Sequence, residues 1–259
     1  MSTFSFMIIA FTFYSFLGWV LETVYCSIPA KKFVYRGFLV GPVCPIYGFG
    51  AMAVISILSP LEKYPILVFF AAVILTSLVE YITCYLLERI FNKTWWDYSH
   101  RKYNLHGRIC LAFSLIWGVL SFILVYLIAP PISKVISCMP LLVRIILSGI
   151  FAIVFVVDLA ISVRDAIRFN IDMNQLTLFA EMIDKKKLEL QNAVSNFRAE
   201  PRAAIEEELQ KLLLQQEELA DKFMRRMRRI LSAFPRMRLS RKDKISLRDR
   251  LQSYLHKKA

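Results

Sequence analysis

Five long stretches of the sequence are apolar enough to cross a lipid bilayer, and this pattern constrains the fold more than any other feature. A membrane-spanning helix needs about 20 mostly apolar residues, because the hydrocarbon core is about 30 Å thick and each helical residue rises about 1.5 Å. The stretches are residues 1–21, 38–59, 65–87, 109–133 and 145–163, and Glu80 and Asp158 are the charged side chains within them. A soluble single domain, a secreted disulfide-rich miniprotein and a disordered chain are therefore excluded.

The charged residues are concentrated after the last apolar stretch. Residues 1–162 carry a net charge of +5 and residues 163–259 a net charge of +8, in a chain with 57% hydrophobic residues. We predict an all-α fold, a polytopic membrane helix bundle of about five transmembrane helices with a helical tail. The predicted domains are a transmembrane domain over 1–163, a cytoplasmic helical hairpin or coiled coil over 164–233, and a basic C-terminal tail over 234–259.

The distribution of Lys and Arg predicts the orientation in the membrane. These residues prefer the cytoplasmic side when they lie in short loops. They are frequent after the first and third apolar stretches and rare after the second and fourth. We therefore expect a multi-pass protein with its N-terminus outside and its C-terminus in the cytoplasm. No Lys or Arg precedes Lys31, so the first stretch is predicted to be a retained helix and not a cleaved signal peptide.

Polar side chains recur every three or four residues along three of the stretches, which places them on one face of each predicted helix. They are Thr12, Ser15, Trp19, Glu22 and Cys26 in the first stretch, Ser77, Glu80, Cys84 and Glu88 in the third, and Cys110, Ser114, Trp117 and Ser121 in the fourth. Lipid cannot satisfy these groups. We therefore expect the three faces to meet one another or a water-filled cavity.

Ionisable residues gather near the predicted cytoplasmic side of the bundle. A carboxylate inside a bilayer costs about 2.5–3.5 kcal/mol on insertion scales, and either an arginine partner or protonation relieves this cost. We expect a network that joins Glu22, Glu80 or Glu88 to Arg36 and Arg108. Two interpretations remain open: an ion-pair network that only fixes the bundle, and a site that handles a solute or substrate.

Two other segments are unusual. Glycines and prolines crowd residues 41–50, which indicates either a broken or re-entrant segment that lines a binding site or a proline-kinked helix. In the loop before the fourth stretch, Trp95 and Trp96 are typical of side chains that anchor a loop at the lipid headgroups. Asp97, which lies between aromatic residues, is a candidate for positioning a cation or a helix N-terminus. The complete set of predicted substrate-binding residues is Glu22, Arg36, Glu80, Glu88, Asp97, Asn104 and Arg108.

Several chemistries have no signature in the sequence. The five cysteines include no Cys-x-x-Cys pair, and there are three histidines with no His-Glu-x-x-His motif. We therefore predict no metal site and no cofactor. There is no Gly-x-Ser-x-Gly motif, and no Gly-x-x-x-x-Gly-Lys-Ser/Thr loop for binding ATP. If transport is driven by ATP, a separate ATPase subunit must supply the motor.

The tail contains two amphipathic helical patterns separated by Glu200-Pro201. Because proline suits a helix start, two helices folded into a hairpin fit the pattern, and a parallel coiled coil in a homo-oligomer is the alternative. Lys186 and Gln216 interrupt the apolar positions. Residues 222–259 hold 14 Lys and Arg against two Asp. This charge favours attraction to anionic lipid headgroups, and without a recognisable motif we expect no nucleic-acid binding.

Four motifs together resemble a known family. They are Gly18-Trp19-x-x-Glu22, the run from Arg36 to Gly50, Trp95-Trp96-Asp97-Tyr98-Ser99, and Asn104-x-x-Gly-Arg-Ile-Cys110. Over about residues 5–160 the chain resembles the bacterial ABC-transporter permease family (type IV, CmpB-like). The resemblance implies a polytopic protein of the bacterial plasma membrane, and it supplies no catalytic residues.

Three hypotheses of function follow. The first is a permease-like component, an ABC transporter permease that binds a small solute in a cytoplasm-facing polar pocket. The second is an intramembrane enzyme acting on a phospholipid or an isoprenoid phosphate, with Arg36 and Arg108 holding phosphate and Asp97 or a Glu as acid and base. The third is a membrane scaffold with a basic, lipid-binding tail.

Overall fold

The structure is a computed structural model that describes residues 2–91, 93–195, 199–234 and 237. Except for Phe234 and Met237, the predicted basic tail lies outside the described residues. The helices are α1 (Ser2–Ala30), α2 (Pro45–Leu58), α3 (Pro65–Phe91), α4 (Leu111–Ile123), α5 (Ala129–Cys138), α6 (Leu141–Ser195) and α7 (Ala199–Ala233). Two short strands, β1 (Asn104–Leu105) and β2 (Ile109–Cys110), pair antiparallel, with Asn104 opposite Cys110. The predicted all-α fold is confirmed.

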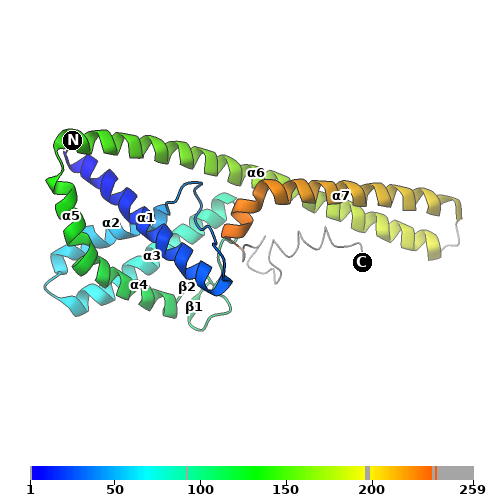
Figure 1. The fold of residues 1–259 in the computed structure, drawn as a ribbon. Helices are drawn as coiled ribbons and strands as arrows, with labels where there is room; N and C mark the ends of the chain where they lie inside the picture. Colours follow the sequence, from blue (N-terminus) through cyan, green and yellow to red (C-terminus); the bar gives the residue numbers. More distant parts are fainter. Residues whose placement is uncertain (1, 92, 196–198, 235–236, 238–259) are drawn as a thin grey trace.

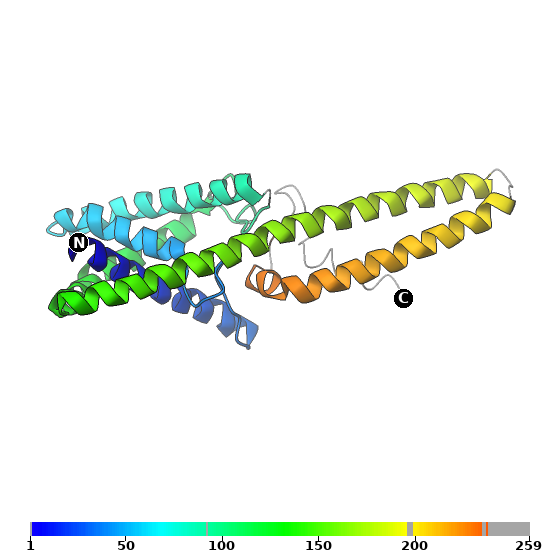
Figure 2. The same ribbon diagram turned by 90° about the horizontal axis from the view of Figure 1, so that it is seen from above.

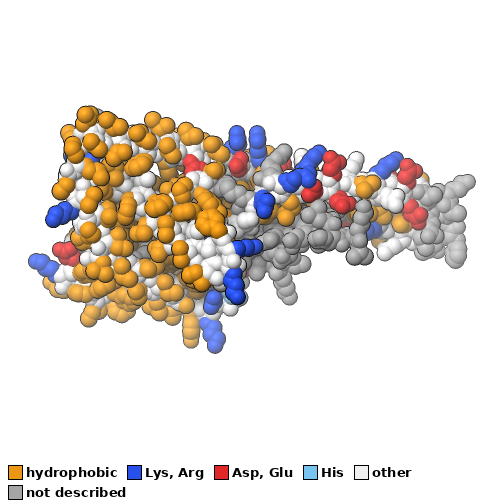
Figure 3. Space-filling view, viewed as in Figure 1, with side chains coloured by type: hydrophobic (Ala, Val, Ile, Leu, Met, Phe, Trp, Pro, Cys, Tyr) orange, Lys and Arg blue, Asp and Glu red, His pale blue; other side chains and the backbone are white. Residues whose placement is uncertain are grey.

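The helices form a bundle from which a long hairpin projects. Helices α1 to α5 and the first half of α6 make up the bundle, and the N-termini of α1 and α6 lie at its far end (Figure 1). Four segments are long and apolar enough to cross a membrane: α1, α3, the continuous segment Leu111–Cys138 and α6. On the face seen in Figure 3, hydrophobic side chains dominate the surface of this block, whereas charged side chains gather on the described part of the hairpin.

The second predicted stretch differs from the other four. Helix α2 has 14 residues and continues only into a short 3-10 turn, Ser59–Leu61, so this segment is shorter than the four candidate spans. Residues 32–44 before it are not helical. The physical reason is local, because Pro42 and Pro45 lack the backbone N–H that a continuous helix needs. The sequence left open a broken segment or a proline-kinked helix, and the structure shows a broken segment.

The fourth span is continuous but irregular. A π-helical segment, Leu124–Ile128, joins α4 to α5 directly before Pro130 and Pro131. Proline removes the hydrogen bond to the preceding turn, and a π segment is a common way for a helix to accommodate this loss. The axis of α5 therefore turns away from that of α4 (Figure 1).

Helix α6 passes without a break from the bundle into the tail, across the boundary that the sequence placed at residue 163. Helix α7 returns beside it as an antiparallel hairpin, one of the two arrangements that the sequence left open (Figure 2). The hairpin is held by an apolar core that includes Phe169, Met173, Leu176, Ala220, Phe223 and Met227. Its base packs on Phe91 and Trp95 of the bundle.

A close approach between α1 and α2 gives the first testable prediction. A Cβ atom on Gly18 would lie 2.2 Å from the Cβ of Tyr47, whereas one on Gly50 would meet nothing within 4 Å. We expect Gly18→Ala to push the two helices apart and to lower the free energy of unfolding by about 1–3 kcal/mol. Gly50→Ala is the matched control and should not destabilise. Unfolding in detergent checks both, and equal stability of the two variants would contradict the packing described.

Candidate functional site

The loops that carry the two predicted arginines lie at one end of the bundle. The segment after α1 holds Arg36, and the loop between α3 and α4 holds Arg108 just before β2. This is the end from which α6 continues into the hairpin, opposite the N-terminus (Figure 1). Of the three acids, Glu88 lies in the last turn of α3, whereas Glu22 and Glu80 lie further inside α1 and α3.

The predicted network forms as two separate ion pairs. Arg36 donates from Nη2 to Oε1 of Glu22 at 2.7 Å, and from Nε to the same oxygen at 3.2 Å. Arg108 donates from Nε and Nη2 to Oε2 of Glu88 at 2.9 and 2.8 Å, and from Nη1 to the hydroxyl of Tyr81 at 2.8 Å. All four charged side chains are between 15% and 22% exposed. Burial alone would lower the pKa of Arg36, but the charge and hydrogen bond of Glu22 together with the neighbouring Cys26 and Tyr47 outweigh burial and raise that pKa.

Glu80, the third predicted acid, has no arginine partner among the described residues. Its side chain is buried, with 9% of the residue exposed. The hydroxyl of Tyr98 donates to its Oε1 at 3.2 Å, and Trp117 of α4 lies beside the same carboxylate. Its other oxygen, Oε2, is buried and has no hydrogen-bond partner among the described residues. Burial, followed by the neighbouring charge of Glu80, raises the pKa of Tyr98.

The polar faces of α3 and α4 meet as predicted, whereas the polar face of α1 packs mainly against α2. Ser77 of α3 donates to the hydroxyl of Ser114 of α4 at 2.7 Å, one turn from Glu80. Glu22 of α1 accepts a contact from the thiol of Cys44 at 3.8 Å, and its charge lies within electrostatic reach of Glu80.

Aromatic side chains complete this cluster. The ring of Tyr47 packs edge-on against Trp117, with centroids 5.6 Å apart, and its hydroxyl lies near Glu22 and Tyr98. We call Glu22, Arg36, Tyr47, Glu80, Tyr98 and Trp117 the polar core. The pair Glu88–Arg108 lies outside it.

Asp97 and Asn104 are not in the polar core, because both side chains fold the loop before α4. Asp97 accepts from the backbone N–H and the hydroxyl of Ser99, both at 2.9 Å. The amide of Asn104 donates to the carbonyl of Arg101 at 2.8 Å and accepts from the N–H of Gly107 at 2.9 Å. A role of either residue in binding substrate stays a prediction.

Trp95 and Trp96 do not lie at the surface as the sequence suggested for headgroup anchors. Trp95 is 4% exposed and packs against Phe91, Phe38 and Phe234, with ring centroids between 4.9 and 5.6 Å apart. Trp96 is partly buried and donates from Nε1 to the carbonyl of Arg108 at 3.2 Å. The two indoles therefore join the loop to the bundle and to the base of the hairpin.

Sequence reasoning missed the role of Asp158. This carboxylate on α6 accepts from the backbone N–H groups of Val40 and Gly41, both at 2.8 Å, and so holds the irregular segment before α2 against α6. Gly41 is needed there, because a Cβ atom would lie 2.8 Å from the Asp158 Oδ2. The signal was present in the sequence, since Asp158 is the charged residue of its apolar stretch.

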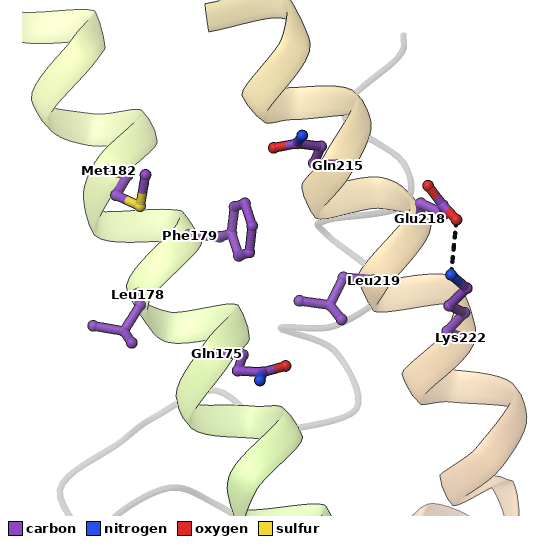
Figure 4. A pocket seen from close by; sticks show the side chains of 8 residues that line it. All are labelled: Gln175, Leu178, Phe179, Met182, Gln215, Glu218, Leu219 and Lys222. Atoms are coloured by element: carbon purple, nitrogen blue, oxygen red, sulfur yellow. Dashed lines mark ion pairs between the residues drawn. The ribbon is translucent and has the colours of Figure 1, made fainter.

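Two surface hollows lie away from these acids. One lies between α6 and α7, where Phe179 and Leu219 point toward each other between Gln175 and Gln215 (Figure 4). The other lies between residues 100–103 and the start of α4. Among the described residues, no group of three or more His, Cys, Asp or Glu side chains is arranged to hold a metal ion.

The comparison with protein families identifies the membrane bundle. A family model described as "Putative ABC-transporter type IV" matches residues 9–163, more than half of the chain. The chain belongs to this family. The match covers α1 to α5 and the first part of α6, and it ends before the hairpin. Together with the apolar helices, membership of this family makes the protein a multi-pass membrane protein of the transporter type. Neither a curated protein nor a solved structure shows significant similarity to the chain.

The ion pair Glu22–Arg36 gives a prediction for stability. Removing one partner leaves the other charge poorly solvated, so Glu22→Gln or Arg36→Met should each lower the free energy of unfolding by about 3 kcal/mol. The double variant should recover part of this loss. The exposed pair Arg164–Asp165, 3.6 Å apart, is the control and should contribute less than about 1 kcal/mol. Additive effects of Glu22→Gln and Arg36→Met in a double-mutant cycle would contradict the pairing.

Proposed function

We propose that the chain is the permease-like component of an ABC-type transporter and that the polar core binds a small solute. The observation that carries this proposal is Glu80, a carboxylate inside a membrane span whose Oε2 has no partner among the described residues. Intramembrane ionisable residues are costly, and those that persist usually serve a pathway or a ligand. A solute with a hydrogen-bond donor or a positive charge would supply the missing partner.

The charge balance of the polar core supports the same class of solute. The core contains two carboxylates, Glu22 and Glu80, and one guanidinium, which already pairs with Glu22. A purely structural ion-pair network should leave no carboxylate without a partner. A buried polar group without a partner costs free energy and can be replaced by an apolar one. Trp19 Nε1 and Ser15 Oγ are also buried on α1 without a partner among the described residues.

The alternative of an enzyme acting on lipid phosphate has weaker support. Phosphate recognition uses guanidinium groups whose donors are free to form bidentate bonds. Both Arg36 and Arg108 donate to glutamates, and they belong to different pairs. The two guanidinium groups are therefore already neutralised by separate carboxylates and do not form a joint phosphate site, so we favour transport.

We further propose that the hairpin end faces the cytoplasm of a bacterial cell and that the N-terminus lies outside. The loops at the hairpin end carry Lys31, Lys32, Arg101 and Lys102, and basic side chains in short loops favour the cytoplasm. The turn between α2 and α3 contributes only Lys63 at the other end.

A separate ATPase subunit is part of this proposal. The sequence has no P-loop, so ATP hydrolysis must come from another polypeptide that meets the transporter on its cytoplasmic side. The homo-oligomer, a coiled coil between subunits and binding of anionic headgroups by residues 234–259 stay predictions, and most of that tail lies outside the described residues.

The proposal is tested with Glu80→Gln, which keeps the size of the side chain and removes its charge. We expect small molecules that co-purify with the unaltered protein in native lipid to be lost from this variant. Glu62→Gln, the same chemical change in the turn at the other end of the bundle, should retain them. Untargeted mass spectrometry of the extracted protein measures the difference.

An unchanged set of bound small molecules in a folded Glu80→Gln variant would overturn the role of Glu80 as a solute ligand. Loss of the same molecules from Glu62→Gln would show that the change acts through charge in general and not through the polar core.

A further inference from the structure

The surface hollow beside the start of α4 combines two kinds of wall. Its volume is about 510 Å³, within the range of sites that hold small ligands. One side is formed by His100, Arg101, Lys102 and Tyr103 of the loop, and the other by Leu111 and Leu115 of α4. All of these residues are exposed. A basic, polar wall therefore lies directly against an apolar one.

The apolar wall belongs to a membrane-spanning segment. Leu111 is 48% exposed and Leu115 41% exposed, and both lie on the candidate span Leu111–Cys138. Exposed leucines on such a span face the acyl chains of the bilayer. The loop residues stand at the first turn of this span, which places them at the depth of the lipid headgroups.

The basic wall is available for an anion. Among the described residues, no carboxylate lies within ion-pair distance of Arg101 or Lys102; the guanidinium of Arg101 lies 6.0 Å from the ring centre of Phe113. Tyr103 is 81% exposed, as is typical of tyrosines in the interfacial belt.

The loop that presents these side chains is held in a defined shape. Asn104 fixes the carbonyl of Arg101, and the backbone N–H of Leu111 donates to the carbonyl of Tyr103 at 3.1 Å. Tyr103 and Gly107 have positive φ angles, 53° and 66°, so the chain turns sharply here. Asn104 therefore helps to hold Arg101 in place beside the start of α4.

We propose that this hollow binds an anionic phospholipid of the leaflet on the hairpin side. The lipid phosphate would lie against Arg101 and Lys102, and its acyl chain would lie along Leu111 and Leu115. The joint presence of a basic wall and a lipid-facing apolar wall favours a phospholipid over a free phosphate. This site is separate from the polar core, so it does not rest on the proposed transport of a solute.

The test compares two charge-removing variants of the full-length protein in bilayer discs of phosphatidylglycerol and phosphatidylcholine. Arg101→Gln combined with Lys102→Gln should reduce the phosphatidylglycerol retained on release into detergent by roughly tenfold or more, because each basic residue near a membrane surface contributes about fivefold in affinity. Lys31→Gln combined with Lys32→Gln is the control, since it removes the same charge from the neighbouring loop. Native mass spectrometry counts the bound lipids.

Equal loss of lipid in both double variants would show general surface attraction and would overturn the site, as would full retention in the Arg101/Lys102 variant. Glycerol phosphate, the headgroup without acyl chains, is the second probe. Binding of this probe as tight as that of the lipid would also overturn the assignment, because the apolar wall would then contribute nothing.

A second measurement uses the unaltered protein and does not depend on a variant folding. A photoactivatable phosphatidylglycerol with its reactive group in the acyl chain should label the peptide that contains Leu111 and Leu115. Labelling that spares this peptide would contradict the proposal.

Discussion

A bilayer core offers no hydrogen-bond partners, so the polar side chains of the apolar helices must satisfy one another. The arrangement of the bundle follows from this constraint. Ser77 and Ser114 join α3 to α4, and Glu22 brings α1 into contact with the arginine of the following segment. Glu22 and Glu88 lie on the side of the bundle where an arginine from a loop can reach them, and this pairing offsets part of the cost of desolvation. These interactions hold α3 against α4 and hold the segment after α1 against α1.

The irregular segment before α2 and the long helix α6 depend on each other. Residues 32–44 cannot satisfy their own backbone groups as a helix would, and Asp158 of α6 accepts two of these N–H groups. The hairpin is connected to the same end of the bundle, because Phe234 packs on Trp95 and lies 5.4 Å from the guanidinium of Arg36. The ring of Phe234 therefore contacts both the buried Trp95 and the guanidinium that pairs with Glu22.

The sequence predicts those features that depend on one-dimensional patterns. Long apolar runs predicted the helices, the three- and four-residue spacing predicted that the polar faces of α3 and α4 meet, and the position of the arginines predicted the ion pairs. The length of α2, the role of Asp158 and the burial of Trp95 could not be predicted in this way. Each depends on a contact between segments far apart in the chain, and Asp158 and Val40 are 118 residues apart. It could likewise not be predicted that no arginine among the described residues pairs with Glu80, because spacing alone cannot distinguish which of two acids on α3 an arginine reaches.

The meeting of the polar faces within the membrane is tested most directly by cross-linking α3 to α4. In a variant without native cysteines, Ser77→Cys combined with Ser114→Cys should form a disulfide readily on oxidation, since the two hydroxyl oxygens lie 2.7 Å apart. Thr76→Cys with Ser114→Cys is the control, because Thr76 is turned by about 100° around the axis of α3 from Ser77 and donates to carbonyls of its own helix, not to Ser114. Rapid cross-linking of the first pair and not of the control is predicted. Equal cross-linking of both pairs, or of neither, would contradict the shared polar interface on which the proposed site depends.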